Sequence, residues 1–268
     1  LFLIYMILGY DEKRPTEKNY HIFVENLVDG LKKYNNEEIS LMLYGSYVRG
    51  DYVAGRSDID AVLVFPYDVL IDKNVFLEVS KIIKYAQQEN NIPFQVTPTD
   101  LRTMKDGRFN SFDPNFKQYF NNEGKIFFGS DYRDQFTYCL SNHSDQNALR
   151  FNLRKSRSGL LFSEHDKYNY YKTFLERFNK TLDAVSRGSK QILTMMDGKL
   201  RKNRFSALEE LSEIFPEVNL EPLRKIKILY HNLEELDKIY RNSKDLIKIW
   251  GDSVSFFESL IKLYIDRF

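Results

Sequence analysis

The sequence predicts an α+β protein, in which an N-terminal domain with a small mixed sheet and helices precedes a C-terminal all-α helical bundle. The first half alternates helical periodicity with short apolar runs that are typical of buried strands. Beyond residue 134 almost every segment has helical periodicity. With 268 residues, the chain is long enough for two domains that each bury a core. We expect these domains to span residues 1–135 and 136–268.

The elements of the N-terminal domain follow from the spacing of its apolar residues. Phe23, Leu27 and Leu31 recur at helical intervals, which predicts a helix over residues 21–34. Pro98 is expected to stop the third strand, because proline lacks the amide hydrogen that a sheet ladder uses. We predict strands at residues 39–44, 59–65, 92–97 and 125–128, a turn with a helical piece at 45–57, and a second helix at 75–88.

The C-terminal domain is predicted to consist of helices that end at glycine or proline. Breaks are expected at Gly188, Gly198 and Pro216. Ser206 and Glu209 have the spacing of a capping box at a helix start. The predicted helices span residues 146–163, 167–186, 190–196, 206–215, 221–241 and 243–268.

Composition limits the classes of partner. The 39 basic and 38 acidic residues leave a net charge of only +1, which argues against nucleic acid as a partner but leaves room for a local basic patch. The single cysteine, Cys139, excludes an internal disulfide and fits a reducing compartment, so a cytoplasmic location is expected. No run reaches the roughly 18 apolar residues of a membrane span. The apolar opening, residues 1–8, is read as a tail or first strand.

One segment combines two patterns that together indicate phosphate chemistry. A buried strand leads into Gly45 and Ser46, and a second strand opens on Asp58 and Asp60. Residues two apart in a strand share a face, so both carboxylates project from one side of the sheet. Such a pair needs a cation between its members, and Mg²⁺ commonly takes one or two carboxylates together with substrate phosphates.

Several residues between the first predicted strand and Asp58 could bind phosphate. Gly45 allows the backbone to approach a phosphate closely, and a turn that enters a helix presents free amides. Ser46 adds a hydroxyl donor. Arg49 and Arg56 follow in the connecting loop, where each is expected either to meet phosphate or to face solvent.

This arrangement of Gly45-Ser46 followed by Asp58-Ile59-Asp60 resembles the signature of the DNA polymerase β-like nucleotidyltransferases. The resemblance implies that a nucleoside monophosphate, AMP from ATP in the first instance, passes to an acceptor hydroxyl with Mg²⁺ and pyrophosphate leaves. Members of the family usually carry a third carboxylate on the next strand, where this sequence has Gln95. Asp100 is the nearest substitute, with a loop or helix cap as its alternative role.

The second half resembles the helical C-terminal domain of the aminoglycoside adenylyltransferases. The resemblance is carried by residues 195–199, 205–211 and 214–216. It implies that a basic side chain at Arg204 reaches the triphosphate, the alternative being an ordinary surface residue. A cationic antibiotic as acceptor would need acidic partners, for which Glu164, Asp166 and Glu176 are available.

Three functions remain open from the sequence. The first is an enzyme that adenylylates a small hydroxylated acceptor, and the second is a nucleotidyltransferase that modifies a protein or a tRNA end. The third is a non-catalytic nucleotide-binding module, which Gln95 in place of an acid favours. All three share a nucleoside triphosphate as ligand.

Overall fold

The computed structural model separates the chain into two compact units, described here one at a time. The described residues from 14 to 137 form the N-terminal unit, and those from 144 to 268 form the helical unit. The structure describes residues 14–34, 38–65, 68–87, 90, 92–106, 116–137, 144–199, 201 and 203–268. The opening run, residues 1–8, and Cys139 lie outside these ranges.

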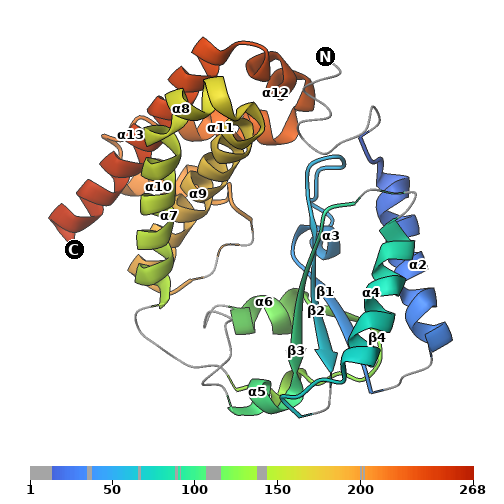
Figure 1. Cartoon of the computed structure of the whole chain (residues 1–268). Coiled ribbons are helices and arrows are strands. Elements are labelled where there is room, and N and C mark those ends of the chain that lie inside the picture. The colour runs from blue at the N-terminus through green and yellow to red at the C-terminus, as the bar shows by residue number, and fades with distance from the viewer. Residues whose placement is uncertain are drawn as a thin grey trace. The chain divides into compact units, whose positions relative to one another are not determined.

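The N-terminal unit is built on a mixed sheet of four strands in the order β3-β2-β1-β4 (Figure 1). Strand β1 pairs antiparallel with both β2 and β4, whereas β2 and β3 run parallel. The predicted mixed sheet is therefore confirmed. The strands are β1 (Ser40–Tyr44), β2 (Ile59–Phe65), β3 (Phe94–Asp100) and β4 (Lys125–Phe128). The helices are α2 (Glu17–Tyr34), α3 (Ser46–Arg49), α4 (Lys73–Gln87), α5 (Leu101–Asp106) and α6 (Phe116–Glu123), followed by the 3₁₀ turn η1 (Arg133–Gln135).

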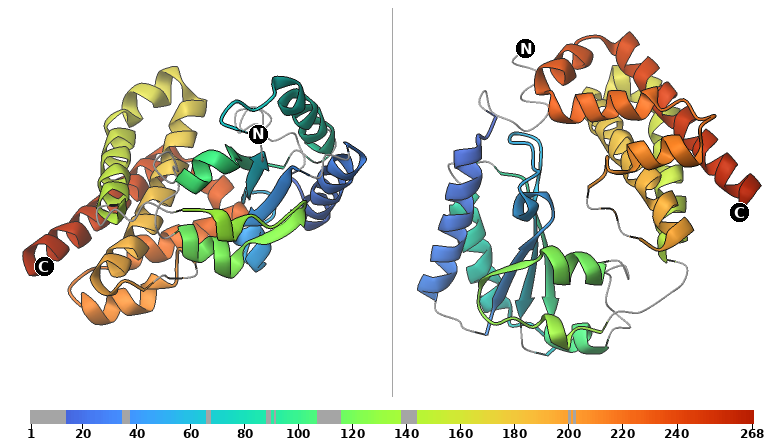
Figure 2. Two further views of the ribbon diagram at one scale, coloured as in Figure 1. Left: turned by 90° about the horizontal axis from the view of Figure 1, so that it is seen from below. Right: turned by 180° about the vertical axis from the view of Figure 1, so that it is seen from behind.

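Each face of the sheet has its own apolar cluster. Helices α2 and α4 cover one face, where Phe23 and Leu27 pack with Ala61 and Leu63 of β2. Helices α5 and α6 lie on the other side of the sheet, as both Figure 1 and Figure 2 show. There, alternate residues of β2 pack against Met104, Phe120 and Phe136. The alternation of β2 between two buried faces explains why its sequence is an almost continuous apolar run.

The third strand extends further than its sequence suggested. Strand β3 continues through Pro98 to Asp100, so the expected stop at this proline is wrong. Strand β3 lies at the edge of the sheet and pairs only with β2 among the described strands. A proline whose missing amide hydrogen would point away from the ladder is tolerated at such an edge.

The helical unit packs its longest helices around one tryptophan. Trp250 is fully buried, and its indole nitrogen donates a hydrogen bond of 2.9 Å to the hydroxyl of Thr181. The rings of Phe174 and Phe178 lie 5.6 and 5.7 Å from the Trp250 ring. The helices are α7 (Ser144–Leu161), α8 (Ser163–Asn169), α9 (Tyr171–Asp197), α10 (Ala207–Ile214), α11 (Glu221–His231), α12 (Leu233–Tyr240) and α13 (Ser243–Arg267). The all-α character predicted for this half is confirmed in the described residues.

Glycine has two different roles in α9. Gly198 ends the helix in the left-handed conformation, as expected. Gly188 does not interrupt it, because α9 runs from Tyr171 to Asp197 without a break. A β-carbon at Gly188 would lie 2.2 Å from Cζ of Phe257 on α13. The glycine is therefore a close contact between two helices rather than a stop signal.

Two further details of the helical unit differ from the sequence prediction. The predicted helix 221–241 is divided, because the Asn232 side chain accepts a hydrogen bond from the Glu235 amide and begins α12. The Ser206 hydroxyl donates to the carbonyl of Asn203 instead of capping α10, so the expected capping box is wrong. Within the described ranges, none of the helices combines the length and apolar character that crossing a bilayer demands.

Candidate functional site

The turn between β1 and α3 is held by a glycine that no other residue could readily replace. Gly45 has φ 77° and ψ −155°, a conformation that side-chain-bearing residues rarely adopt. A β-carbon built at this position would lie 2.5 Å from Oδ2 of Asp60. The absent side chain therefore gives the Asp60 carboxylate the space it occupies, directly against the backbone of the turn.

Strand pairing fixes the neighbours of Asp60. In the sheet register, Asp60 lies opposite Tyr44 of β1 and opposite Gln95 of β3. Residues that face each other across paired strands project from the same side of the sheet. The Asp60 carboxylate therefore has a phenol on one side and an amide on the other.

Asp58 lies two residues before Asp60, in the loop that leads into β2. The amide of Ile59 donates to the carbonyl of Pro93 at 2.9 Å, so the chain is already beside β3 at this point. The Asp58 carboxylate makes no hydrogen bond or ion pair with other described residues, and it is partly exposed. It is thus available to an external cation or donor.

This loop is held by a buried tyrosine that no sequence pattern singled out. The Tyr20 hydroxyl of α2 donates a hydrogen bond of 2.5 Å to the carbonyl of Ser57, the residue before Asp58. Ser57 in turn closes the loop on Val53 through two hydrogen bonds, of 2.8 and 2.9 Å. Because Tyr20 is fully buried, the position of the Asp58 backbone is coupled to the packing of α2.

Gln95 occupies the strand position at which a third carboxylate was expected. It is exposed and stands directly beside Asp60 in the parallel register. An amide oxygen can bind a cation, but it carries no charge and accepts no proton at neutral pH. The site therefore has two carboxylates and one amide along adjacent strands.

Asp100 is not part of this group. It pairs in register with Phe65, five positions along β3 from Gln95, which corresponds to about 16 Å. Its carboxylate accepts hydrogen bonds of 2.7 Å from both the amide and the hydroxyl of Thr103. The residue therefore caps α5, the alternative role considered for it, and the expectation that it substitutes for the third acid is corrected.

The two arginines of the connecting loop have different surroundings. Arg49 donates to Glu123 of α6 at 2.8 Å and to Asp51 at 3.2 Å. Burial alone would lower the pKa of Arg49, but the hydrogen bonds and charges of Glu123 and Asp51 outweigh it and raise that pKa. Arg56 is partly buried in the turn that precedes Ser57. Arg49 is thus engaged with carboxylates, and a phosphate contact would require it to exchange a partner.

Aromatic rings enclose the side of the turn that faces α2. The ring centroid of Tyr20 lies 4.9 Å from that of Tyr52 and 6.5 Å from that of Tyr47. Burial, followed by the proximity of Tyr52 and Glu25, raises the pKa of Tyr47. The Tyr47 phenol therefore remains neutral at physiological pH, and the three rings support the turn as packing groups.

The donor set suits a hard divalent cation. Asp58 and Asp60 supply carboxylate oxygens, Gln95 supplies an amide oxygen beside them, and no sulfur or imidazole stands in register with them. Among the described residues, no group of three or more His, Cys, Asp and Glu side chains is arranged to hold a metal. A cation here would therefore complete its coordination with ligand oxygens, as Mg²⁺ does when it binds through one or two carboxylates and substrate phosphates.

The comparison with known families agrees with this geometry. Residues 24–123 match the family model described as nucleotidyltransferase domain. This segment is a nucleotidyltransferase domain. The match begins within α2, ends with α6, and contains the glycine turn and both site aspartates. No curated protein matches the sequence.

Outside this nucleotidyltransferase domain, Arg204 belongs to the helical unit. Its guanidinium forms an ion pair with Asp183 and stacks over the Tyr230 ring at 4.4 Å. The side chain is only one-fifth exposed. The structure therefore gives Arg204 two intramolecular partners, and its predicted contact with the triphosphate stays a prediction.

The acidic residues considered for a cationic acceptor differ in their availability. Asp166 is buried and lies 2.9 Å from Arg177 and 3.0 Å from His165. Glu164 is exposed and Glu176 is partly exposed. Of these three acids, Glu164 and Glu176 have carboxylates at the surface of the helical unit.

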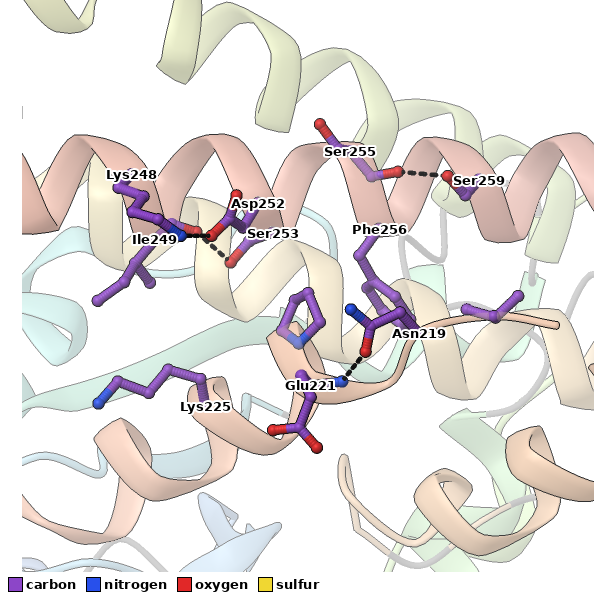
Figure 3. A pocket seen from close by; sticks show the side chains of 12 residues that line it. Asn219, Glu221, Lys225, Lys248, Ile249, Asp252, Ser253, Ser255, Phe256 and Ser259 are labelled. Carbon is purple, nitrogen blue, oxygen red and sulfur yellow. Dashed lines mark hydrogen bonds and ion pairs between the residues drawn. The ribbon is translucent and has the colours of Figure 1, made fainter. Parts of the chain in front are cut away.

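A separate cavity of about 700 Å³ lies in the helical unit, between α11 and α13 (Figure 3). Its walls come from residues 218–225 and 248–259. The charged pair Lys248 and Asp252 is joined at 2.7 Å within these walls. None of the site residues predicted from the sequence lines this cavity.

The contact between Gly45 and Asp60 generates a prediction with an internal control. Gly50 also has a positive φ, of 84°, but a β-carbon there would meet nothing within 4 Å. Gly50→Ala should cost about 1–2 kcal/mol of unfolding free energy from backbone strain alone. Gly45→Ala should cost more, because the new methyl group also displaces the Asp60 carboxylate. Urea unfolding of both variants measures the difference, and equal costs would contradict the proposed contact.

Proposed function

We propose that this protein transfers AMP from ATP to a hydroxyl group of a small acceptor molecule, with Mg²⁺ bound by Asp58 and Asp60. The nucleotidyltransferase domain over residues 24–123 supports nucleotidyl transfer in general. ATP, Mg²⁺ and the small acceptor are our inference from the site chemistry and from the resemblance of the helical half to aminoglycoside adenylyltransferases.

The observation that carries the proposal is the contact between the Asp60 carboxylate and the Gly45 backbone. This closeness supports a shared site, because a cation held by Asp60 would be within reach of a phosphate that lies on the glycine turn. The Ser46 hydroxyl makes no hydrogen bond with other described residues and is available as a donor to the same phosphate. Cation and phosphate ligands thus come from one short segment.

The proposed reaction forms one bond and breaks one. The acceptor oxygen bonds to the α-phosphorus while the bond from that phosphorus to the oxygen bridging the β-phosphate breaks. Pyrophosphate leaves with the electron pair, and the hydroxyl proton passes to a base or to water. Mg²⁺, when bound, neutralises charge on the α-phosphate and the leaving group. The residues of the chain position the triphosphate, which is the larger part of catalysis in phosphoryl transfer.

Removal of the acceptor proton is the step for which this site is poorly equipped. Gln95 cannot accept the proton, and Asp100 is engaged in capping α5. An acceptor hydroxyl of ordinary pKa would then lose its proton to water late in the reaction. We therefore propose a slow transferase rather than a fast one.

The exposed amide at Gln95 also favours a second candidate, a module that binds nucleotide without turnover. The two candidates agree on Mg²⁺-dependent binding of ATP and differ on pyrophosphate release. Incubation with labelled ATP, Mg²⁺ and a panel of aminoglycoside and lincosamide acceptors separates them. Labelled acceptor with stoichiometric pyrophosphate supports the transferase, and recovery of intact ATP supports the binding module.

Loss of either site aspartate is expected to abolish Mg²⁺-dependent nucleotide binding. Asp58→Asn and Asp60→Asn each remove a charged cation ligand while nearly preserving volume, so the fold should remain intact. Asp29→Asn is the matched control, because Asp29 is an exposed carboxylate of α2 whose ion-pair partner among the described residues is Lys32, 3.7 Å away. Calorimetric titration with ATP and Mg²⁺ should show a loss of at least about ten-fold in both site variants. Affinity equal to that of the control would exclude the metal site.

A carboxylate introduced at Gln95 is expected to raise turnover. Gln95→Glu places a proton acceptor beside Asp60, and a positioned base typically contributes about 10² to 10⁴-fold. Gln135→Glu adds the same charge at an exposed position in η1 and should leave turnover unchanged. Pyrophosphate release measures both. An unchanged rate in Gln95→Glu would mean that proton removal is not the slow step.

A further inference from the structure

Positive charge is concentrated in one part of the helical unit, although the chain as a whole is nearly neutral. Between residues 150 and 190 the sequence holds ten basic and four acidic residues, a surplus of six in a chain whose net charge is +1. This segment comprises most of α7, all of α8 and most of α9. Although the net charge of the whole chain is close to zero, residues 150–190 therefore form a strongly basic region.

Helix α7 presents its basic residues side by side on the exposed surface. Arg150 and Arg154 are one helical turn apart, and Lys155 follows directly. All three are exposed. Helix α9 adds Lys180 and Arg187, which are two turns apart and also exposed. We call these five residues the α7–α9 basic surface.

The two helices bring their charges close together. Gly159 of α7 packs against α9, since a β-carbon there would lie 2.8 Å from the Thr181 hydroxyl. Lys155 is one turn before this contact. Burial, together with the nearby charges of Lys180 and Arg187, lowers the pKa of Lys155. The basic groups of the two helices therefore repel one another across the helix contact.

The repulsion is not relieved by ion pairs. In the described part of the chain, none of the five residues of the α7–α9 basic surface pairs with an acid. Asp183, the nearest acid in α9, is engaged by Arg204. Some lysines elsewhere on the unit are paired, for example Lys262 with Asp266 at 2.5 Å. The α7–α9 basic surface differs in that five basic residues without an acidic partner in the described ranges lie on two helices that pack together.

An aromatic ring completes the surface. Phe151 follows Arg150 on α7 and is 55% exposed. The ammonium of Lys155 lies 5.5 Å from the centroid of this ring. Exposed aromatic rings among cations are the feature on which unpaired bases stack in proteins that bind single strands.

We propose that the α7–α9 basic surface binds the phosphate backbone of a single-stranded nucleic acid, with Phe151 as a stacking platform for a base. Unpaired cations gain free energy when they displace the counterions condensed on a polyanion. A stacked base adds affinity without strong sequence preference. This surface belongs to the helical unit alone, so the proposal does not depend on the proposed function of the N-terminal unit.

Binding of labelled oligonucleotides to the full chain in EDTA tests the proposal. EDTA removes any contribution of a metal-bound nucleotide site, and Asp58→Asn should bind as the natural sequence does. We expect single-stranded RNA or DNA of about 20 nucleotides to bind at low salt, with a slope of log K against log salt of about −3.5 for five cations. The double variant Lys155→Gln and Arg187→Gln should reduce the magnitude of this slope by about 1.4 and weaken binding about ten-fold at about 50 mM salt.

A matched double variant controls for the loss of charge. Lys248→Gln and Lys262→Gln remove two exposed lysines of α13 that are ion-paired in the free protein. This variant should retain the slope and affinity of the natural sequence. Absence of oligonucleotide binding at about 25 mM salt, or an equal loss in both double variants, would overturn the proposal. Stronger binding to phosphatidylserine vesicles than to either oligonucleotide would instead assign the surface to membranes.

Discussion

The contact between the Asp60 carboxylate and the backbone of Gly45 is the constraint around which the N-terminal unit is organised. It requires a glycine in a conformation that other residues avoid, at the point where β1 ends. It also requires β1 and β2 to be paired in one register, since a slip of one residue would turn Asp60 to the opposite face. The two apolar clusters that fix this register therefore serve the site directly, as does Tyr20 through its hydrogen bond to Ser57.

Groups of like charge lie together on the two surfaces to which we assign ligands. In the N-terminal unit, Asp58 and Asp60 bring two carboxylates to one side of the sheet, and we propose a cation as their ligand. In the helical unit, the exposed cations of the α7–α9 basic surface favour the binding of an anion. Other charged groups, such as Arg49 with Glu123, are paired within the fold and contribute packing instead. In our proposals both surfaces bind phosphate compounds, the first through Mg²⁺ and the second directly.

The sequence predicted those parts of the site that depend on local spacing. The alternation of Asp58 and Asp60 and the glycine turn can be recognised within a few residues. The contribution of Tyr20 could not, because it depends on a carbonyl 37 positions away. The helix break predicted at Gly188 was wrong for the same reason, because Phe257, which Gly188 contacts, lies on another helix. The prediction that Pro98 ends the third strand was wrong because β3 lies at the edge of the sheet, where a proline is tolerated. The edge position depends on the order of all four strands and cannot be predicted from the residues of β3 alone.

A crystal structure of the full chain with Mg²⁺ and a non-hydrolysable ATP analogue would show whether the glycine turn and the two aspartates form one site. We expect a cation about 2.0–2.1 Å from carboxylate oxygens of Asp58 and Asp60, with ligand phosphate oxygens completing its coordination. We also expect a phosphate on the backbone of Gly45 and Ser46. A triphosphate bound away from this turn, or a cation held without either aspartate, would exclude the proposed site.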